Sequence, residues 1–399
     1  YSLARSTLGQ MAVRIALQCS EADAHLILSE DNTAARLLTR PGEAIYNDAN
    51  GLLEGNHPFQ VVWLAEGDRE DYLRKIHELA RRRSYRTTPP IVFEGNQPAD
   101  VGLNPLLRDL VGRDTWPETP RASRAWLGAA VAIKDPTAAL LRRQSGANML
   151  AVGQQPEGAL GLLATSLVSL AAQHSSHATN GDGRSAVRFF VLDGTAPDAP
   201  QAAYWTDLAA TLPHDVQVAR TRDAARLMAE LDEEVTRRET VSADDAPPWY
   251  VFVYDLGRFR DLRKADDDFG FSMGESKPAS PGKQFAHVLR EGAALGIHVL
   301  VWCDTYNNVV RSIDRQGLRD FEIRVLFQMS GTDSSNLIDS PAASKLGVHR
   351  ALLYSEEEAR VEKFRPYGPP SATWLAWVQS QLATRAAAGP LPLALGENT

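Results

Sequence analysis

Cysteine and long apolar runs are scarce in this 399-residue chain, and its 42 basic residues are outnumbered by 50 acidic ones. The two cysteines, Cys19 and Cys303, each lie in an apolar strand-like run, which predicts buried, reduced thiols of a cytosolic protein. No apolar run reaches the roughly 18 residues that a membrane-spanning helix needs. The net charge of −8 argues against a surface that mainly coats nucleic acid, although a few loops could still contact DNA.

One segment near the start of the chain is repeated near its end. Residues 13–23 match residues 323–333 at a spacing of 310 positions, and apolar positions mostly match apolar positions. This spacing is the size of a whole domain, whereas solenoid repeats are roughly 20 to 50 residues long. We therefore expect the tail of one module followed by a complete second module, in a chain cut from a longer protein. Four matched pairs are identical: Arg14 and Arg324, Gln18 and Gln328, Ser20 and Ser330, Asp23 and Asp333.

The alternation of strand-like and helix-like segments predicts an α/β protein with a mostly parallel sheet that is covered on both faces. In the second module, strands are expected at residues 125–133, 148–152, 187–192, 216–219, 249–254, 298–302 and 322–327. Helices are expected at residues 157–172, 206–212, 221–238, 283–294 and 371–387. The predicted organisation is residues 1–86 as the C-terminal part of an upstream module, 87–123 as a connector with one short helix, 124–370 as the complete module, and 371–399 as a C-terminal helix and tail.

In the second module, an apolar strand leads into a turn with two glycines and then into a long apolar helix. Gly153 and Gly158 have the spacing of a P-loop, in which backbone N–H groups at a helix N-terminus hold phosphates. The motif requires a lysine on the phosphates and then a hydroxyl on Mg²⁺, but this chain has Ala159 and Leu160. Glu157 adds a negative charge where phosphate would lie. These residues alone leave two interpretations open, a degenerate nucleotide site or a strand–turn–helix with chance glycines.

Two later strands each end in an acidic residue. The apolar run 249–254 is followed by Asp255, which is the layout of a Walker B segment. Leu256 occupies the position where an active enzyme has a glutamate that polarises the attacking water. The run 297–303 is followed by Asp304. Open α/β sheets bind ligands at the carboxyl ends of their strands, so both carboxylates belong at the same edge as the glycine turn.

Taken in order, these segments resemble the RecA-like motor domain of the FtsK/SpoIIIE family. The resemblance covers about residues 124–366, and the first 60-odd residues match the end of a second motor domain. It implies a P-loop NTPase (RecA-like) three-layer fold with a mostly parallel central sheet, preceded by the C-terminal piece of another such module. It also implies that Asp255 is the Mg²⁺-organising aspartate and Asp304 the polar sensor. The degenerate nucleotide site would comprise Gly153, Gln154, Gln155, Gly158, Ala159, Leu160, Asp255 and Asp304.

The resemblance supports two functions. The first is the C-terminal region of an ATP-dependent DNA translocase, in which the degenerate module has a structural or regulatory role and no catalytic residue. The alternative resembles the type VII secretion ATPases EccC and EssC, whose later modules bind substrate peptides. The parent protein would use ATP and Mg²⁺ in its upstream motor module and form a homo-oligomeric ring, whereas this module would bind neither. We expect a cytoplasmic location, with membrane attachment only through upstream segments.

Overall fold

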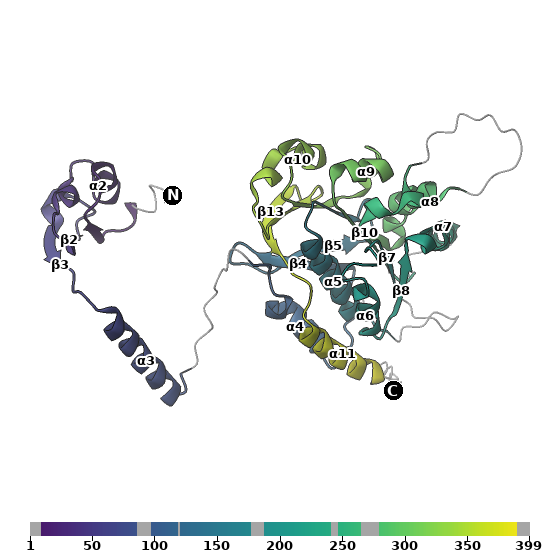
Figure 1. The fold of residues 1–399 in the computed structure, drawn as a ribbon, viewed down its shortest axis with the longest axis horizontal. Helices are drawn as coiled ribbons and strands as arrows, with labels where there is room; N and C mark the ends of the chain where they lie inside the picture. The colour runs from purple at the N-terminus through teal and green to yellow at the C-terminus, as the bar shows by residue number, and fades with distance from the viewer. Residues whose placement is uncertain are drawn as a thin grey trace, which may run out of the picture. The chain divides into compact units, whose positions relative to one another are not determined.

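The computed structural model describes residues 9–85, 97–118, 120–176, 187–240, 246–264 and 279–388. The chain divides into two units, Tyr1–Val92 and Phe93–Thr399 (Figure 1). The division falls inside the segment that the sequence assigns to a connector. The tail expected at the C-terminus, from residue 389 onward, lies outside the described residues.

Within the described residues, the first unit contains a small antiparallel sheet and the helices α2 and α3. The strands β1 (Arg14–Leu17), β2 (Glu43–Asn47) and β3 (Asn56–Gln60) pair in that order. The helix α2 (Glu21–Ile27) follows β1, the 3₁₀ turn η1 (Ala34–Leu37) precedes β2, and α3 (Glu66–Arg82) follows β3. The core is small, and its buried members are Ala16, Ala24, Leu28, Ala35 and Ile45.

The second unit is built on a ten-stranded sheet with the order β5-β4-β13-β12-β11-β6-β10-β9-β7-β8. All pairings from β11 to β8 are parallel, whereas those from β5 to β11 are antiparallel. The strands are β4 (Ala122–Ala130), β5 (Thr137–Arg142), β6 (Met149–Val152), β7 (Arg188–Asp193), β8 (Asp215–Arg220), β9 (Trp249–Tyr254), β10 (Ile297–Cys303), β11 (Ile323–Phe327), β12 (Ala351–Ser355) and β13 (Arg360–Pro366).

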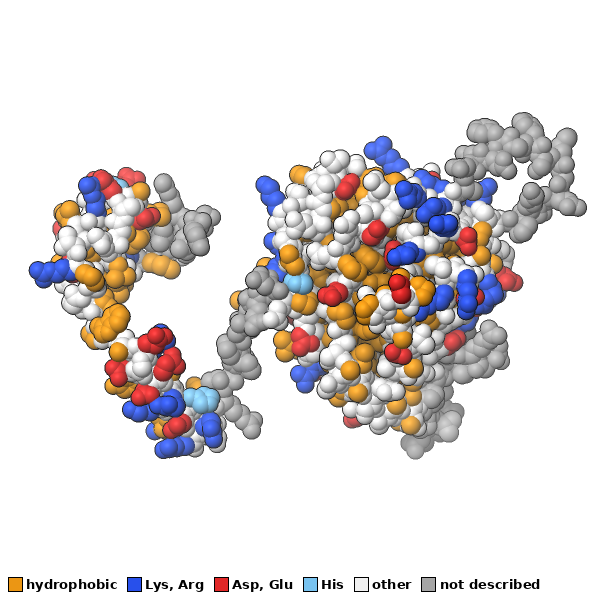
Figure 2. All heavy atoms as spheres, in the orientation of Figure 1, with side chains coloured by type: hydrophobic (Ala, Val, Ile, Leu, Met, Phe, Trp, Pro, Cys, Tyr) orange, Lys and Arg blue, Asp and Glu red, His pale blue; other side chains and the backbone are white. Residues whose placement is uncertain are grey.

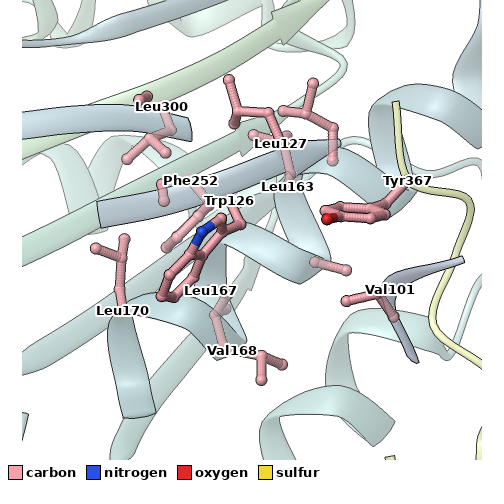
Figure 3. Close-up of a cluster of buried hydrophobic side chains, with 14 of the residues drawn as sticks. Val101, Trp126, Leu127, Leu163, Leu167, Val168, Leu170, Phe252, Leu300 and Tyr367 are labelled. Atoms are coloured by element: carbon pink, nitrogen blue, oxygen red, sulfur yellow. The ribbon is translucent and has the colours of Figure 1, made fainter. Parts of the chain in front are cut away.

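Helices cover both faces of this sheet, which gives three layers. One apolar cluster includes side chains of α4, α5, α6 and α11, and a second cluster on the opposite face includes side chains of α7, α8, α9 and α10. Figure 3 shows part of the first cluster, where Leu163 and Leu167 of α5 lie near Trp126 and Phe252 of the sheet. The helices are α4 (Pro105–Val111), α5 (Pro156–Gln173), α6 (Tyr204–Ala210), α7 (Ala224–Thr240), α8 (Pro281–Glu291), α9 (Tyr306–Ser312), α10 (Gly331–Ile338) and α11 (Ala372–Ala387).

The predicted α/β fold with a parallel central sheet is confirmed, and one half of the sheet differs from expectation. The sequence predicts none of β5, β12 and β13, and it does not reveal that β4 pairs antiparallel to its neighbours. The segment assigned to a connector is also part of this unit: Leu107 and Val111 of α4 are fully buried, and Ala99 forms a bridge with Tyr367. Periodicity shows which residues of a helix are apolar but not what they pack against.

The repeated sequence corresponds to a repeated structure. The order β1, α2, η1, β2, β3, α3 recurs as β11, α10, the 3₁₀ turn η9 (Pro341–Lys345), β12, β13 and α11. The matched arginines make the same hydrogen bond in both copies. Arg14 donates to the Ile27 carbonyl at 3.2 Å, and Arg324 donates to the equivalent Leu337 carbonyl at 2.8 Å. The matched serines Ser20 and Ser330 both cap the following helix.

The two copies differ in what covers them. In the second unit β11 pairs with β12 on one side and with β6 on the other, so Val325 and Phe327 are fully buried. In the first unit β1 pairs with β2 alone among the described strands, and its Ile15 and Leu17 are 57% and 55% exposed. The helix α3 has no buried residue, although it carries an apolar stripe of Tyr72, Leu73, Ile76 and Leu79.

The structure tests the expected burial of the two cysteines and the expected lack of a membrane-spanning helix. Cys303 is buried and Cys19 is half-buried, so the predicted burial is confirmed for the first thiol and wrong for the second. Cys19 follows the end of β1, whose outer edge has no covering strand in the described chain. Within the described ranges, no helix has both the length and the apolar character needed to cross a membrane.

Candidate functional site

The glycine turn joins β6 to α5 at the carboxyl edge of the parallel strands. Gly153 has φ +135°, its N–H donates to the Cys303 carbonyl at 3.1 Å, and its own carbonyl accepts from Trp302 Nε1 at 3.0 Å. The helix begins at Pro156, two residues before Gly158. Proline is well suited to a first helical position because its ring fixes φ and it has no N–H to satisfy. The predicted four-residue gap between the glycines is therefore half helix, and the open turn is only Gly153–Gln155.

The aromatic ring of Phe327 fills the space beside both glycines. A Cβ added to Gly153 would lie 2.7 Å from Phe327 Cβ, and one added to Gly158 would lie 3.1 Å from the ring atom Cε1. Phe327 ends the neighbouring strand β11 and is fully buried. Close packing against this side chain therefore requires glycine at position 153, where the positive φ adds a second requirement.

A cavity of about 230 Å³ lies beside the turn, and we call it the P-loop pocket. Its lining contains two carboxylates, Asp304 and Asp333, and no lysine or arginine. A phosphate-binding site has the opposite character, with N–H donors and a cation facing the anion. The lining residues are Val152, Gly153, Gln154, Asp304, Thr305, Tyr306, Gln328, Met329, Ser330 and Asp333.

Asp255 follows β9 in a left-handed backbone conformation, with φ 63° and ψ 65°. Its Oδ2 lies 3.4 Å from Nε of Arg258. Burial, reinforced by the negative charge of Asp304, raises the pKa of the Asp255 carboxyl, and Arg258 partly opposes this. The following residue, Leu256, is fully buried in the apolar core beneath this edge. The position of the expected catalytic glutamate is thus occupied by a core side chain.

Asp304 is held by its own neighbours at the start of α9. Its Oδ1 accepts hydrogen bonds from Asn308 Nδ2 at 2.7 Å and from Thr305 Oγ1 at 3.3 Å. These bonds occupy the carboxylate oxygen that the sequence assigns to a sensor role. Together with the proximity of Asp255, they make this edge a place of partly buried negative charge.

The structure brings together some of the predicted site residues and separates others. Gly153, Gln154 and Asp304 line the P-loop pocket, whereas Asp255 does not. Ala159 and Leu160 face the apolar core of α5 and are buried. The remaining predicted residues outside the lining are Gln155 and Gly158.

Sequence reasoning missed three lining residues that belong to the repeat. Gln328, Ser330 and Asp333 contribute to the P-loop pocket, and each is identical to its counterpart 310 positions earlier. The repeat therefore marks site-facing positions in addition to scaffold positions such as Arg324. The identity of polar residues across the two copies was the signal that could have revealed them, because a purely structural repeat needs to keep mainly its apolar positions.

The fold implies ATP with Mg²⁺, and the residues present do not fit that group. Positions 159 and 160 supply neither a cation nor a hydroxyl, and the lining of the P-loop pocket is acidic. In the part of the chain that the structure describes, no group of three or more His, Cys, Asp or Glu side chains could hold a metal ion. No reaction step is therefore assigned to this site.

No family model matches the chain, and no curated protein matches its sequence. Among solved structures, it is similar to the cytoplasmic domain of the Thermomonospora curvata type VII secretion ATPase EccC, with 17% identity and a TM-score of 0.56 over 98% of this chain and 46% of that chain. The chain thus spans less than half the length of that relative.

Two further structures are similar at lower scores. The pCW3 conjugation coupling protein TcpA has 14% identity and a TM-score of 0.47, over 68% of this chain and 75% of that one. EssC (ATPases 2 and 3) from Geobacillus thermodenitrificans has 14% identity and a TM-score of 0.48, over 76% of this chain and 54% of that one. The sheet topology and the likeness to EccC show that the chain has the three-layer, RecA-like fold of P-loop ATPases, as the resemblance to the FtsK/SpoIIIE family implied.

Proposed function

We propose that the second unit is a P-loop module that no longer binds or hydrolyses ATP and that has a structural or regulatory role in a larger tandem ATPase. The observation that carries this proposal is the acidic P-loop pocket beside an incomplete motif, with Ala159 in place of the lysine. Removing one charge-stabilising group of this kind costs about 3–4 kcal/mol of transition-state stabilisation. Here the lysine, the hydroxyl and the Walker B glutamate are all replaced by apolar residues.

The first unit is proposed to be the C-terminal part of an upstream motor module. Gln18, Ser20 and Asp23 are exposed, and their counterparts in the second unit line the P-loop pocket. The same three residues would then close the nucleotide pocket of the upstream module. In this proposal the ATP and Mg²⁺ of the parent protein bind there, and the parent assembles as a ring of identical subunits in the cytoplasm.

A role in polypeptide transport, similar to that of EccC, is one candidate function. The likeness to the EccC chain extends over 98% of this chain and therefore includes both units in one order. A DNA translocase is the second candidate, supported by the ordered segments that resemble FtsK/SpoIIIE motors. The net charge of −8 weighs against a large DNA-binding surface.

Hydrolysis of Mg-ATP by the full chain tests the catalytic part of the proposal. We expect phosphate release at the rate of the protein-free solution, because Leu256 occupies the position of the glutamate that would polarise the attacking water. A faster rate that Asp255→Asn abolishes would contradict the proposal. The aspartate variant separates a true activity from that of a contaminating ATPase, which the substitution would leave unchanged.

Binding of DNA distinguishes the two substrate classes. A DNA translocase requires duplex binding that weakens steeply as salt rises, because phosphate contacts release counterions. The polypeptide alternative requires capture of a substrate peptide that persists in competing DNA. If the protein does not bind duplex DNA at low salt, a DNA translocase function is excluded. If the tandem protein does not capture a substrate peptide, a function in polypeptide transport is excluded.

A further inference from the structure

A second cavity, of 660 Å³, lies farther along the same edge of the sheet, where β7, β8 and β9 end. It shares no lining residue with the P-loop pocket. Its lining contains one carboxylate, that of Asp193, and five guanidinium groups, and we call it the arginine pocket. The five cationic residues are Arg220, Arg222, Arg258, Arg260 and Arg263.

One arginine shapes the wall of this pocket. Arg220 lies 3.0 Å from the Asp193 carboxylate and also donates to the carbonyls of Thr195, at 3.1 Å, and Ala202. The Asp193 side chain is fully buried, and its other oxygen accepts from the Thr195 N–H at 2.8 Å. The Asp193 carboxylate, the only carboxylate of the described lining, therefore pairs with Arg220. No lining carboxylate remains to pair with the other four arginines.

Two arginines of the pocket lie in and after a 3₁₀ turn and have no partner among the described residues. Arg260 begins the 3₁₀ turn η6 (Arg260–Leu262), and Arg263 follows it. Phe259 and Leu262 are buried in the core and anchor this turn. Within the described ranges, no acceptor lies within hydrogen-bonding or ion-pairing distance of the Arg260 or Arg263 guanidinium. By contrast, Arg222 and Arg258 lie 3.4 Å from Asp223 and Asp255, respectively.

The charge of this pocket is opposite to that of the whole chain, which is −8. A cavity lined by one sign of charge focuses the field and concentrates ligands of the opposite sign. Figure 2 shows Lys and Arg side chains gathered on the part of the second unit that carries α7, α8 and α9. Arginine, rather than lysine, supplies all five cations, and its planar fork matches the oxygens of phosphate and carboxylate groups.

Charge density favours phosphate over carboxylate. Five arginines and one aspartate line the pocket, and Asp223 and Asp255 pair with two of these arginines from outside the lining, which leaves a net charge of about +2. A chain of linked phosphates can match this charge in a small volume, whereas a peptide would have to place separate carboxylates in the same 660 Å³. Among the described lining residues there is no aromatic side chain on which a base could stack, which favours recognition of phosphate. We propose that the arginine pocket binds a ligand that carries several linked phosphate groups, through Arg260 and Arg263.

The experiment is a calorimetric titration of inorganic triphosphate into the full chain at low salt, with chelator and without Mg²⁺. The double variant R260A/R263A removes two cations and no contact found within the described chain. We expect it to weaken binding at least about tenfold, since each lost bond is charge-assisted. R260K/R263K keeps the charge but loses the fork, and should weaken binding less. R69A/R74A on α3 removes the same net charge from exposed positions, 52% and 68% exposed, and should bind as the unsubstituted chain does.

Equal weakening by the R260A/R263A and R69A/R74A variants would overturn the proposal, as would an absence of triphosphate binding at low salt. An acidic peptide of equal charge that binds as tightly as triphosphate would also overturn it. Displacement of triphosphate by a single-stranded oligonucleotide would identify the source as a nucleic-acid backbone, and failure of displacement would identify a free polyphosphate or nucleotide. Either result supports a ligand that carries linked phosphate groups. The proposal is independent of the inactivity of the P-loop, since these variants leave the P-loop pocket unchanged.

Discussion

The segment from β11 to α11 lies within a ten-stranded sheet and its covering helices, whereas the matching segment from β1 to α3 lacks a covering strand in the described chain. In the second unit, α11 buries Trp374, Val378 and Leu382 against the main core. The corresponding helix α3 has no buried residue, and its Ile76 is 63% exposed. Both helices begin after the same five-residue interval from the preceding strand.

The comparison shows which features form from the local sequence of the segment and which require packing against the rest of the second unit. Caps, turns and strand pairing form in both copies, so they depend on local sequence. The apolar outer edge of the first strand and the stripe of the last helix become buried only where β6, α4 and α5 are present. In the second unit, the part that carries the glycine turn therefore supplies the core that buries this segment.

The largest contrast is expected between Phe327→Ala and Leu17→Ala, which alter the same position of the two copies. Phe327 is fully buried beside the glycine turn, so its truncation should lower the free energy of unfolding by about 3–5 kcal/mol. Leu17 is 55% exposed, and its truncation should change stability by less than about 0.5 kcal/mol. Urea unfolding followed by tryptophan fluorescence measures the effect of Phe327→Ala. The signal reports mainly on the second unit, because Trp63 is the only tryptophan before residue 93.

Hydrogen exchange in β1 and β2 measures the effect of Leu17→Ala on the first unit. Similar losses in both units would mean that the edge of β1 is covered in the free chain, and the comparison between the copies would fail.

Acid should destabilise the second unit before the first. Burial, with neighbouring histidines, lowers the pKa of His174 to about 3, and burial lowers that of His298 to about 4. Because the unfolded chain takes up these protons near pH 6.5 and the folded chain does not, the free energy of unfolding falls as pH drops below 6.5. Between pH 6.5 and 5.5 the two histidines together should remove about 2 kcal/mol of the free energy of unfolding.

Tryptophan-monitored urea unfolding at several pH values measures this dependence. His174→Gln keeps a polar side chain near Ser123 and Tyr250 but cannot titrate, so it should reduce the pH slope by about half. An unchanged slope in this variant would show that His174 is not the group responsible.

The smallest effect is expected for the two helix caps. Ser20→Ala and Ser330→Ala each remove the side-chain acceptor for one N–H group, at 3.2 Å and 3.1 Å, and each should cost about 1 kcal/mol. Hydrogen exchange in α2 and α10 compares them, with Ser344→Ala as a control on an exposed hydroxyl. Equal effects would confirm that capping is local. A much larger effect of Ser330→Ala would show that the surrounding module adds to this bond.

Several features of the site could be predicted from sequence because they depend on short-range pattern. The β6 strand, the long apolar helix and Asp255 at the end of β9 follow from apolar runs and the residues that end them. The repeat of Arg, Gln, Ser and Asp also predicted a shared scaffold, and both arginines donate to equivalent carbonyls.

Other features depend on contacts that no local pattern encodes. The start of α5 at Pro156 and the Phe327 ring beside both glycines arise where a distant strand packs against the turn. The arginine pocket likewise joins residues from β8 and from the turns after β9, which lie about 40 positions apart in sequence. Antiparallel β5 and β13 lie at the less regular side of the sheet, where burial alternates and apolar runs are short.

The central claim is that the P-loop pocket does not bind Mg-ATP, and its most direct test is calorimetric titration of Mg-ATP into the R260A/R263A variant. This variant removes the two arginines of the arginine pocket that have no acceptor within the described residues, so any remaining saturable binding reports on the P-loop pocket. The account predicts no saturable heat at millimolar Mg-ATP. One-to-one binding with a Kd below about 100 µM would contradict it, since that affinity would require about 5 kcal/mol of binding free energy from an acidic pocket without its lysine.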